Sequence, residues 1–494
     1  MHEYGFWSIV PPVVAIALAI RTKQVYVSLF AGIWLGWVII NKGNILEGTF
    51  DALQGLVDTF KSDGNTKTVM FTLLVGALIA FIQRSGGVGG FVLRVNTIME
   101  RLDEKSPGKN RIFIQLLAGL TGILIFVETN ISILTVGTLY RPIFDRLKIS
   151  REKLAYICDS TSSPTSILIP FNAWGAFIMG LLAAQHFDQP LNALFSAYVF
   201  NFYPMIALLI VVIVITKGKD IGPMKRAEQR VLEEGKLMAE GSRPMIPEDV
   251  LVMHPDDKTL LKARNMIVPI GSMVLLMPFM LIYTGWDSSA DPEAPWFSLV
   301  FQAIGNGSGS SAVLYSVFGA LLIAFLMYWI SSTLKPAEMM ELSLKGMSGM
   351  LNMALLMVFA FAIGNLCSEL QTGAYVAEIS RNWLSPGLVP TIIFITSSFI
   401  AFSTGTSWGT FAIMIAIAVP MSQSFGSNVY LAVAAALGGG VFGDHCSPIS
   451  DTTIISSMAS ASDHIDHVRT QLPYALISGV VTIILYLILG FTIG

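Results

Sequence analysis

Apolar runs of about 17 residues or more recur along the chain and are separated by short polar or charged stretches. A helix of that length covers about 30 Å, the thickness of the hydrocarbon core of a bilayer. The pattern therefore predicts an all-α polytopic membrane protein. The ten crossings that we expect lie at about 6–20, 25–41, 68–84, 153–184, 194–216, 265–284, 312–333, 350–370, 429–460 and 473–493.

Two further apolar regions, 111–140 and 387–420, carry polar or glycine-containing interruptions at their centres. Basic residues cluster in the loops 21–23, 101–111, 141–153, 217–264 and 335–345. The positive-inside rule places such loops in the cytoplasm. This orientation makes 111–140 a re-entrant hairpin from the inside and 387–420 one from the outside, and it leaves both termini outside.

The chain contains an internal repeat. The segment 69–87 has the same layout as 355–373, 286 positions later, and Asp159 and Asp444 lie 285 positions apart. Each of these carboxylates lies in a stretch of Ser, Thr and Pro that we expect to break a membrane helix. With the orientation above, the two repeats have inverted topology, an arrangement in which transporters build a site at the bilayer midplane.

The repeats predict a domain order. We expect N-terminal scaffold helices over 1–67, and a first repeat over 68–216 with its hairpin at 111–140 and its broken helix at 153–184. A cytoplasmic linker over 217–264 and connecting scaffold helices over 265–349 follow. The second repeat covers 350–494, with its hairpin at 387–420 and its broken helix at 429–460. The linker has mixed charge and is expected to be solvated, with a regulatory element as the alternative.

Composition agrees with a membrane protein rather than a soluble enzyme. Of the 494 residues, 53% are hydrophobic and 13% are charged, whereas soluble domains carry about 25% charged residues. The first apolar run follows a start without a basic residue and contains Pro11 and Pro12, so we expect a first helix rather than a cleaved signal peptide. The three cysteines have no metal-ligand spacing. We expect no organic cofactor, no nucleic-acid partner and no enzymatic nucleophile.

Acidic and hydroxyl side chains gather in the interrupted segments. An ionised carboxylate at mid-bilayer costs about 2.5 to 3.5 kcal/mol on insertion scales, so such residues usually have a function. Sodium prefers several oxygen ligands, as other hard cations do. The candidate ion-binding residues are Asp159, Asp444, Glu128, Asn130, Thr129, Ser160, Ser163, Thr404, Thr406, Ser407, Ser447 and Asp451.

Asp159 and Asp444 are the first candidates for ion and proton exchange. Because burial disfavours the charged form of a carboxyl group, a proton and a sodium ion can compete for one buried carboxylate, which is sufficient for antiport. Asp451 lies seven residues after Asp444, so it is either a second ligand or the partner of a hydroxyl group.

Structural roles compete with these functional ones. Any single Ser or Thr in a membrane helix often bonds only to the backbone of its own helix. We expect His445 to be a polar residue at a helix break rather than a proton shuttle, and Glu369 to lie at the membrane interface. The segment Asp463 to His467 contains two Asp and two His residues, and we expect it to be a solvated cytoplasmic turn.

The stretch 438–453, Gly-Gly-Gly-Val-Phe-Gly-Asp-His-Cys-Ser-Pro-Ile-Ser-Asp-Thr-Thr, resembles the NhaC-type sodium/proton antiporters, as does 403–409, Ser-Thr-Gly-Thr-Ser-Trp-Gly. The broader ion transporter superfamily to which that family belongs is made of inverted-repeat dimers with a scaffold domain and a mobile elevator domain. The resemblance implies a homodimer whose substrate is held by two hairpin tips, 128–130 and 404–407, and two broken-helix loops, 159–163 and 444–447.

The resemblance leaves the substrate open, because similar proteins exchange malate and lactate or are thought to carry amino acids. Superfamily members that carry dicarboxylates show Ser-Asn-Thr at both hairpin tips, whereas these tips read Glu-Thr-Asn and Thr-Gly-Thr. Neither the tips nor the broken loops contain a Lys or Arg that could pair with a substrate carboxylate. We therefore expect a sodium/proton antiporter of the bacterial inner membrane. The alternatives are a sodium- or proton-coupled carrier of an organic acid or amino acid and, third, a channel.

Overall fold

The computed structural model describes residues 4–22, 24–91, 93–94, 110–126, 129–170, 172–243, 260–286, 296–372, 375, 378 and 385–493. Within these ranges the regular elements are helices, and no β-strand occurs. Seven of the described helices are long and apolar enough to cross a membrane, or up to nine if each bent pair is one span. The expected all-α, multi-pass membrane protein is therefore confirmed.

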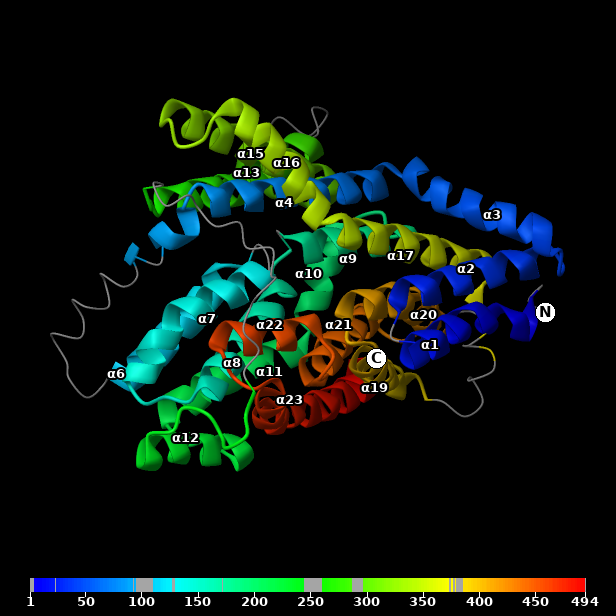
Figure 1. Ribbon diagram of the computed structural model, residues 1–494. Coiled ribbons are helices and arrows are strands. Elements are labelled where there is room, and N and C mark those ends of the chain that lie inside the picture. The colour runs from blue at the N-terminus through cyan, green and yellow to red at the C-terminus, as the bar shows by residue number, and fades with distance from the viewer. Residues whose placement is uncertain are drawn as a thin grey trace.

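The N-terminal helices form one side of the molecule, as Figure 1 shows in blue. They are η1 (Gly5–Ile9), α1 (Val10–Thr22), α2 (Val25–Ile40), α3 (Ile45–Asp58) and η2 (Thr59–Lys61). The sequence analysis did not predict α3, which is too short for a span. The Asn44 side chain caps it by accepting bonds from the N–H groups of Leu46 and Glu47 (3.2 and 3.3 Å).

Helix α4 (Asp63–Arg84) lies between α9 and α17 on one side and a group of later helices on the other (Figure 1). Gly76 and Gly346 allow the crossing of α4 and α16 to be very close. A Cβ atom at either glycine would lie 2.3 Å from the other's carbonyl oxygen. The later helices are α13 (Arg264–Gly285), α14 (Trp296–Asn306), α15 (Gly309–Ile330) and α16 (Pro336–Gly349).

Each predicted hairpin region forms two helices that contact each other. The first pair is α6 (Asn110–Leu124) and α7 (Thr129–Arg146), and the second is α19 (Val389–Thr404) and α20 (Ser407–Phe425), which η3 (Pro386–Leu388) precedes. Gly405 makes the turn between α19 and α20 with φ +69°, a conformation that favours glycine.

Each predicted broken-helix region forms two shorter helices. They are α8 (Arg151–Ser166) with α9 (Ala173–Ala184), and α21 (Val429–Cys446) with α22 (Asp451–Ser460). The expected loop at 159–163 is wrong, because these residues lie inside α8 and the break begins only after Ser166. The proline of the first region, Pro164, is inside the helix and does not end it. In the second region the helix ends at Cys446, two residues after Asp444, and Pro448 follows.

Four further helices complete the bundle. Predicted span 194–216 is two helices bent by 47°, because the chain leaves helical geometry at 199–201. The helices are α10 (Pro190–Tyr198), α11 (Phe202–Lys217), α17 (Leu351–Glu369) and α23 (His464–Ile493).

The segment after α11 is not a solvated linker throughout, which corrects that expectation for the part described. It contains α12 (Gly222–Glu234), whose Met224 and Val231 are fully buried. Glu228 on α12 receives a bond from Arg111 (2.7 Å) and one from the backbone N–H of Ser150 (2.8 Å). Amphipathic spacing and these charge-assisted bonds hold α12 against the bundle.

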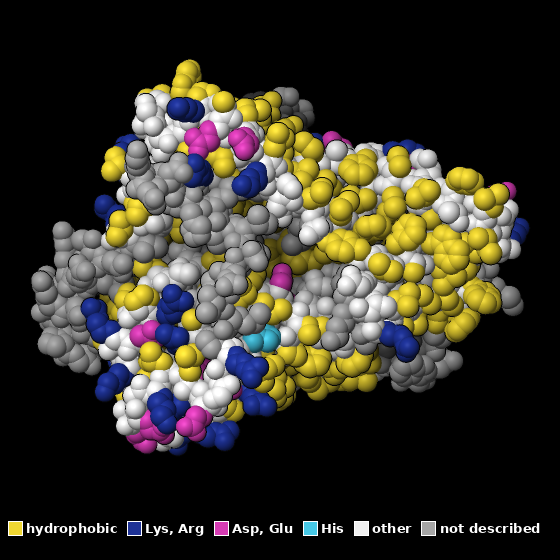
Figure 2. All heavy atoms as spheres, viewed as in Figure 1, with side chains coloured by type: hydrophobic (Ala, Val, Ile, Leu, Met, Phe, Trp, Pro, Cys, Tyr) yellow, Lys and Arg dark blue, Asp and Glu magenta, His cyan; other side chains and the backbone are white. Residues whose placement is uncertain are grey.

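The buried hydrophobic side chains form two cores. One core joins side chains of α6, α7, α8, α11, α12, α22 and α23, and the other joins those of most remaining helices. The surface in Figure 2 shows hydrophobic side chains over α2, α3 and α17, whereas charged side chains gather around α12. Buried Ser, Thr, Asp, His and Gln side chains are concentrated on α8, α21, α22 and α23, and we call this set of side chains the polar layer.

Candidate functional site

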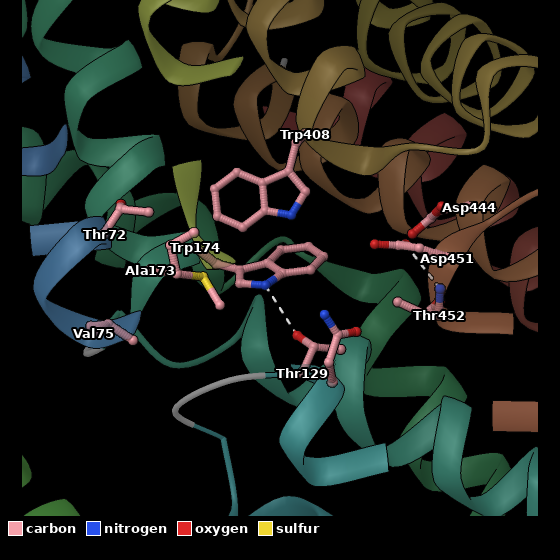
Figure 3. A pocket seen from close by; sticks show the side chains of 11 residues that line it. Thr72, Val75, Thr129, Ala173, Trp174, Trp408, Asp444, Asp451 and Thr452 are labelled. Atoms are coloured by element: carbon pink, nitrogen blue, oxygen red, sulfur yellow. Dashed lines mark hydrogen bonds between the residues drawn. The ribbon is translucent and has the colours of Figure 1, made fainter. Parts of the chain in front are cut away.

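A cavity of about 40 Å³ opens where the first hairpin, the start of α9, the tip of the second hairpin and the second helix break meet. Two carboxylates line it, and the side chains in Figure 3 converge on it from α4, α7, α9, α20, α21 and α22. The lining residues are Thr72, Val75, Thr129, Asn130, Ala173, Trp174, Met350, Trp408, Asp444, Asp451 and Thr452.

Asp444 is the buried carboxylate of this cavity, with 3% of its surface exposed. It lies in the last turn of α21. Its Oδ2 accepts a hydrogen bond from Ser407 Oγ at the tip of the second hairpin (2.8 Å). Its Oδ1 is buried and has no hydrogen-bond partner in the described structure. Ser407 therefore positions Asp444 and leaves one carboxylate oxygen available.

Asp451 is the exposed carboxylate of the cavity. It is the first residue of α22, and its Oδ1 accepts from the backbone N–H of Thr452 (2.9 Å), as the dashed line in Figure 3 shows. A carboxylate is stabilised at this end of a helix by the unpaired N–H groups. A cation that enters the cavity can therefore contact Asp451 before it reaches the more deeply buried Asp444.

The first hairpin contributes Thr129 and Asn130, the first two residues of α7. The Oδ1 atom of Asn130 is buried and has no hydrogen-bond partner. Thr129 Oγ1 accepts from Trp174 Nε1 (3.2 Å) and donates to Ser166 Oγ (3.3 Å). Glu128, predicted at this tip, lies outside the described residues.

Two tryptophans form the apolar wall of the cavity, and sequence reasoning did not select them as site residues. The rings of Trp174, on α9, and Trp408, on α20, lie 5.3 Å apart between centroids. Trp174 also contacts Phe411 edge-on, at 5.9 Å. Trp174 follows the first helix break, and Trp408 follows the turn of the second hairpin, so an aromatic residue shortly after an interruption of a helix was a signal in the sequence. Tryptophan in membrane helices, however, is common enough that the signal is weak.

Other predicted residues of the second hairpin and break support the cavity without lining it. Thr404 Oγ1 donates to the carbonyl of Ile400 (2.8 Å), and Ser447 Oγ donates to that of Phe402 (2.7 Å). Thr406 is likewise absent from the lining, and its carbonyl accepts from Thr410 Oγ1 (2.9 Å). A Cβ atom at Gly405 would lie 2.6 Å from the Ile449 carbonyl oxygen, so the hairpin tip packs directly on the break.

Asp159 does not line the cavity. It is fully buried in the middle of α8, and its Oδ2 accepts from Gln471 Nε2 on α23 (2.6 Å). Two histidine nitrogens lie near the same oxygen: His467 Nε2 at 3.5 Å and His445 Nε2 at 3.8 Å. Asp159 is therefore part of a separate cluster of buried polar groups, which we call the Asp159 cluster: Asp159, His445, His467 and Gln471.

The neighbouring candidates on α8 also lie away from the cavity lining. Ser160 Oγ lies 3.1 Å from His445 Nε2, whose other ring nitrogen, Nδ1, lies 2.8 Å from the Tyr203 hydroxyl. Ser163 is buried, and its hydroxyl has no partner in the described structure. His445 is thus held by two side chains, a more specific setting than the polar helix-break position that we expected.

The expectation of a solvated turn from Asp463 to His467 is wrong for His467, which is fully buried. Asp463 directly precedes α23 instead, and its carboxylate accepts from the N–H groups of Ile465, Asp466 and Arg243. Partial burial raises the pKa of Asp463, but these three backbone bonds lower it below its usual value. The spacing of His467 and Gln471, four residues apart on one helix face, was the signal available in the sequence.

The electrostatics of the cavity favour a cation. Asp444 and Asp451 supply negative charge, and no lining residue among those described is Lys, Arg or His. The unpartnered oxygens of Asn130 and Asp444 lack the ligand or donor that buried acceptors normally have. About 40 Å³ holds a few water-sized particles, whereas sites for drug-sized ligands measure about 300 Å³ or more. Glu369, exposed at the end of α17, is not part of this site.

Comparison with known proteins agrees with this architecture. A protein of Haemophilus influenzae without assigned function is 34% identical over 497 residues, covering 98% of this chain and 91% of the relative. A Bacillus subtilis malate-2H(+)/Na(+)-lactate antiporter is 32% identical over 135 residues (24% and 29%). The Na(+)/H(+) antiporter NhaC of Alkalihalophilus pseudofirmus is 30% identical over 133 residues (24% and 29%).

A solved structure shares the fold. Neisseria gonorrhoeae MtrF, described as illuminating a class of antimetabolite efflux pumps, superposes with a TM-score of 0.54 at 16% identity, covering 90% of this chain and 85% of that one. The fold, the apolar helices and the relatives define a secondary transporter rather than an enzyme. The model of the Na+/H+ antiporter family matches residues 177–491, and the chain belongs to that family.

Proposed function

We propose that the protein exchanges sodium ions for protons across the bacterial inner membrane by alternating access. The cation binds in the cavity, with Asp444 and Asp451 supplying charge and Thr129 and Asn130 supplying neutral oxygens. One observation carries this proposal. Two carboxylates and the Asn130 amide line a small cavity that no basic side chain lines among the described residues, and Asp444 and Asn130 each have one buried oxygen without a partner.

Exchange follows from competition for the carboxylates. A sodium ion and a proton each neutralise negative charge in the cavity, and a carboxylate pair close together favours binding either of them. A sodium ion and a proton cannot both neutralise the Asp444 carboxylate at the same time. Each loaded form of the protein therefore carries one or the other. In this proposal sodium is the transported ion and not a resident metal of the protein.

The packing supports an inverted-repeat, elevator-type mechanism as part of the proposal. The first hairpin helix α7 packs against α22, the second half of the other repeat's broken helix, and α20 packs against α9 in the same crosswise way. This exchange of partners supports a division into two repeats around one site. We propose the domain order given above, a homodimer, and termini on the outer side, for which the basic loops are the argument.

Proton flux in proteoliposomes tests the function. A pH-sensitive dye inside vesicles that hold the purified protein should respond when sodium alone is added outside. Empty vesicles and vesicles with Asp444→Asn serve as the two controls. No sodium-driven response from correctly folded protein would contradict sodium/proton exchange.

A second candidate is a carrier that couples sodium or protons to an organic acid or amino acid. The partial similarity to a malate-2H(+)/Na(+)-lactate antiporter favours it. It predicts that the dye responds only when malate, lactate or an amino acid accompanies sodium, and that labelled solute accumulates. The absence of a basic side chain at the described cavity lining weighs against it, since carboxylate substrates are usually held by Arg or Lys.

A further inference from the structure

The Asp159 cluster is a second set of titratable groups in the polar layer, and the exchange mechanism above does not use it. Asp159 and His467 are both fully buried, on helices α8 and α23. The Oδ1 atom of Asp159 and both ring nitrogens of His467 lack hydrogen-bond partners in the described structure. Buried polar groups without partners are rare in folded proteins and require an explanation.

The contact between Asp159 and His467 has a geometry that one added proton would turn into an ion pair. Their Oδ2 and Nε2 atoms lie 3.5 Å apart, within the range of an ion pair but without hydrogen-bond geometry. A neutral imidazole carries only one N–H, so at least one of its nitrogens has no proton to donate. Adding one proton makes both nitrogens donors and converts the contact into an ion pair.

Other titratable or charged groups face this pair from the helices around it. They are Cys158 on α8, Tyr203 on α11, His445, Cys446 and Asp444 on α21, and Asp451 on α22. On α19 and η3, which also pack against α23, the sequence contains no titratable side chain.

Three basic residues, one each on α6, α8 and α12, do not neutralise Asp159, because each pairs with another acidic residue. Arg230 pairs with Glu152, Arg111 with Glu228, and Lys153 with Asp220. Among the described residues, the only cationic groups within ion-pair distance of Asp159 are the two histidines, when protonated.

We propose that Asp159 and His467 together bind one proton at a site separate from the cation cavity. This inference rests on the proposed function. Without the proton the pair carries one negative charge, and with it the pair is an imidazolium beside a carboxylate with no net charge. Because Asp159 lies within electrostatic reach of Asp444 and Asp451, the negative charge strengthens cation binding and the proton weakens it.

A proton that is linked to sodium binding changes the pH dependence of sodium affinity, which can be measured. If a ligand expels one proton when it binds, its dissociation constant changes by up to about tenfold per pH unit, and each further linked proton adds another factor of about ten. Competition in the cavity supplies one linked proton, and the Asp159 and His467 pair supplies a second. In the purified wild-type protein, sodium affinity should therefore depend on pH more steeply than one proton allows.

The test is equilibrium binding of radioactive sodium to detergent-purified protein between about pH 5 and 9. His467→Gln should lose one linked proton. The steepest change of its sodium dissociation constant per pH unit should therefore be smaller than that of wild type by a factor of up to about ten. Its affinity at the alkaline end should stay within about twofold of wild type. His186→Asn is the matched control, because His186 is exposed and its φ of +61° suits asparagine.

A second variant and a second readout keep the proposal falsifiable. Asp159→Asn should remove the same linked proton, and the double variant should show the same pH slope as either single variant because the two residues bind one proton as a unit. Infrared difference spectra over the same pH range detect protonation of the pair without transport or sodium. They should show one titrating group in wild type that is missing from His467→Gln.

The outcomes separate the two claims. Wild-type protein that binds no sodium at any pH contradicts the proposed function, and the infrared titration alone then decides whether the pair binds a proton. Sodium binding with an unchanged pH slope in both variants overturns the proton site while the cation cavity stands. An infrared spectrum of His467→Gln that equals the wild-type spectrum would also overturn it.

Discussion

Asp159 and Asp444 lie 285 positions apart, at matching positions of the two repeats that we propose, but their surroundings differ. Asp444 lies two residues before the end of α21, next to the cavity, with one oxygen free and a second carboxylate lining the same space. Asp159 lies seven residues before the end of α8 and is enclosed by Gln471, His467 and His445. The position of the helix break thus decides which of the two carboxylates lines the cavity.

The same difference in surroundings supports the different roles that we propose for the two carboxylates, cation binding at Asp444 and proton binding at Asp159. At a helix break the backbone leaves regular hydrogen bonding, and side chains of opposing segments can leave a small space between them. Inside a continuous helix the neighbouring side chains pack closely and exclude such a space. A proton needs no cavity, since it binds to atoms already in place, whereas a sodium ion needs both space and several oxygens.

The largest effect should follow from removing the charge of Asp444. Asp444→Asn leaves a neutral side chain of the same shape in the cavity lining, and it should lower sodium uptake by at least about 100-fold, as expected for a binding charge that no other group replaces. Uptake of radioactive sodium into vesicles with an imposed proton gradient measures this. Glu369→Gln, an exposed carboxamide substitution at the end of α17, is the matched control and should transport normally.

Asp451→Asn should have a smaller effect, because Asp451 is exposed and water screens its charge. We expect the KM for sodium to rise about tenfold, equivalent to about 1.4 kcal/mol, while the maximal rate stays near that of wild type. Initial rates over a range of sodium concentrations give both constants. A loss as complete as that of Asp444→Asn would show that the two carboxylates act as one indivisible site.

Trp174→Phe removes the N–H donor to Thr129 while it keeps an aromatic ring beside Trp408. One hydrogen bond contributes about 0.5 to 1.5 kcal/mol, so the KM for sodium should rise by about two- to tenfold. Trp408→Phe is the paired variant, since Trp408 contacts Trp174 through its ring. Equal effects of the two substitutions would show that ring packing, and not the bond to Thr129, governs the cavity wall.

The smallest effect at alkaline pH should come from His467→Gln. This substitution leaves the Asp159 carboxylate and the cation ligands in place, so sodium KM at about pH 9 should stay within about twofold of wild type. The change should appear as the pH is lowered, as a flatter dependence of KM on pH. An Asp159→Asn protein that loses transport at every pH, like Asp444→Asn, would remove the distinction between the two carboxylates.

The sequence was sufficient for the class of protein and for the positions of most long helices. Apolar runs report burial in lipid directly, and the motif around Asp444 pointed to the family. The end of α8 could not be predicted, because Pro164 was expected to break the helix and instead lies in its last turn. The environment of Asp159 is set by residues more than 280 positions away, His445, His467 and Gln471, whose contacts depend on tertiary packing.

Helix α12 lies outside the pattern of long apolar runs and was also not predicted from the sequence. The apolar face of α12 is formed by Met224, Ala227 and Val231 in a segment rich in charge, so its hydrophobic signal is weak when composition is averaged. Its docking depends on ion pairs with Arg111 and Glu152, partners that sequence spacing does not identify.

The most direct test of the account is proton movement in proteoliposomes after sodium alone is added, with wild type, Asp444→Asn and Glu369→Gln compared at equal protein density. The account predicts a dye response for wild type and Glu369→Gln and none for Asp444→Asn. A response that appears only when an organic acid or amino acid is present, or one that Asp444→Asn retains in full, would contradict the assignment of the cavity as a site of sodium and proton exchange.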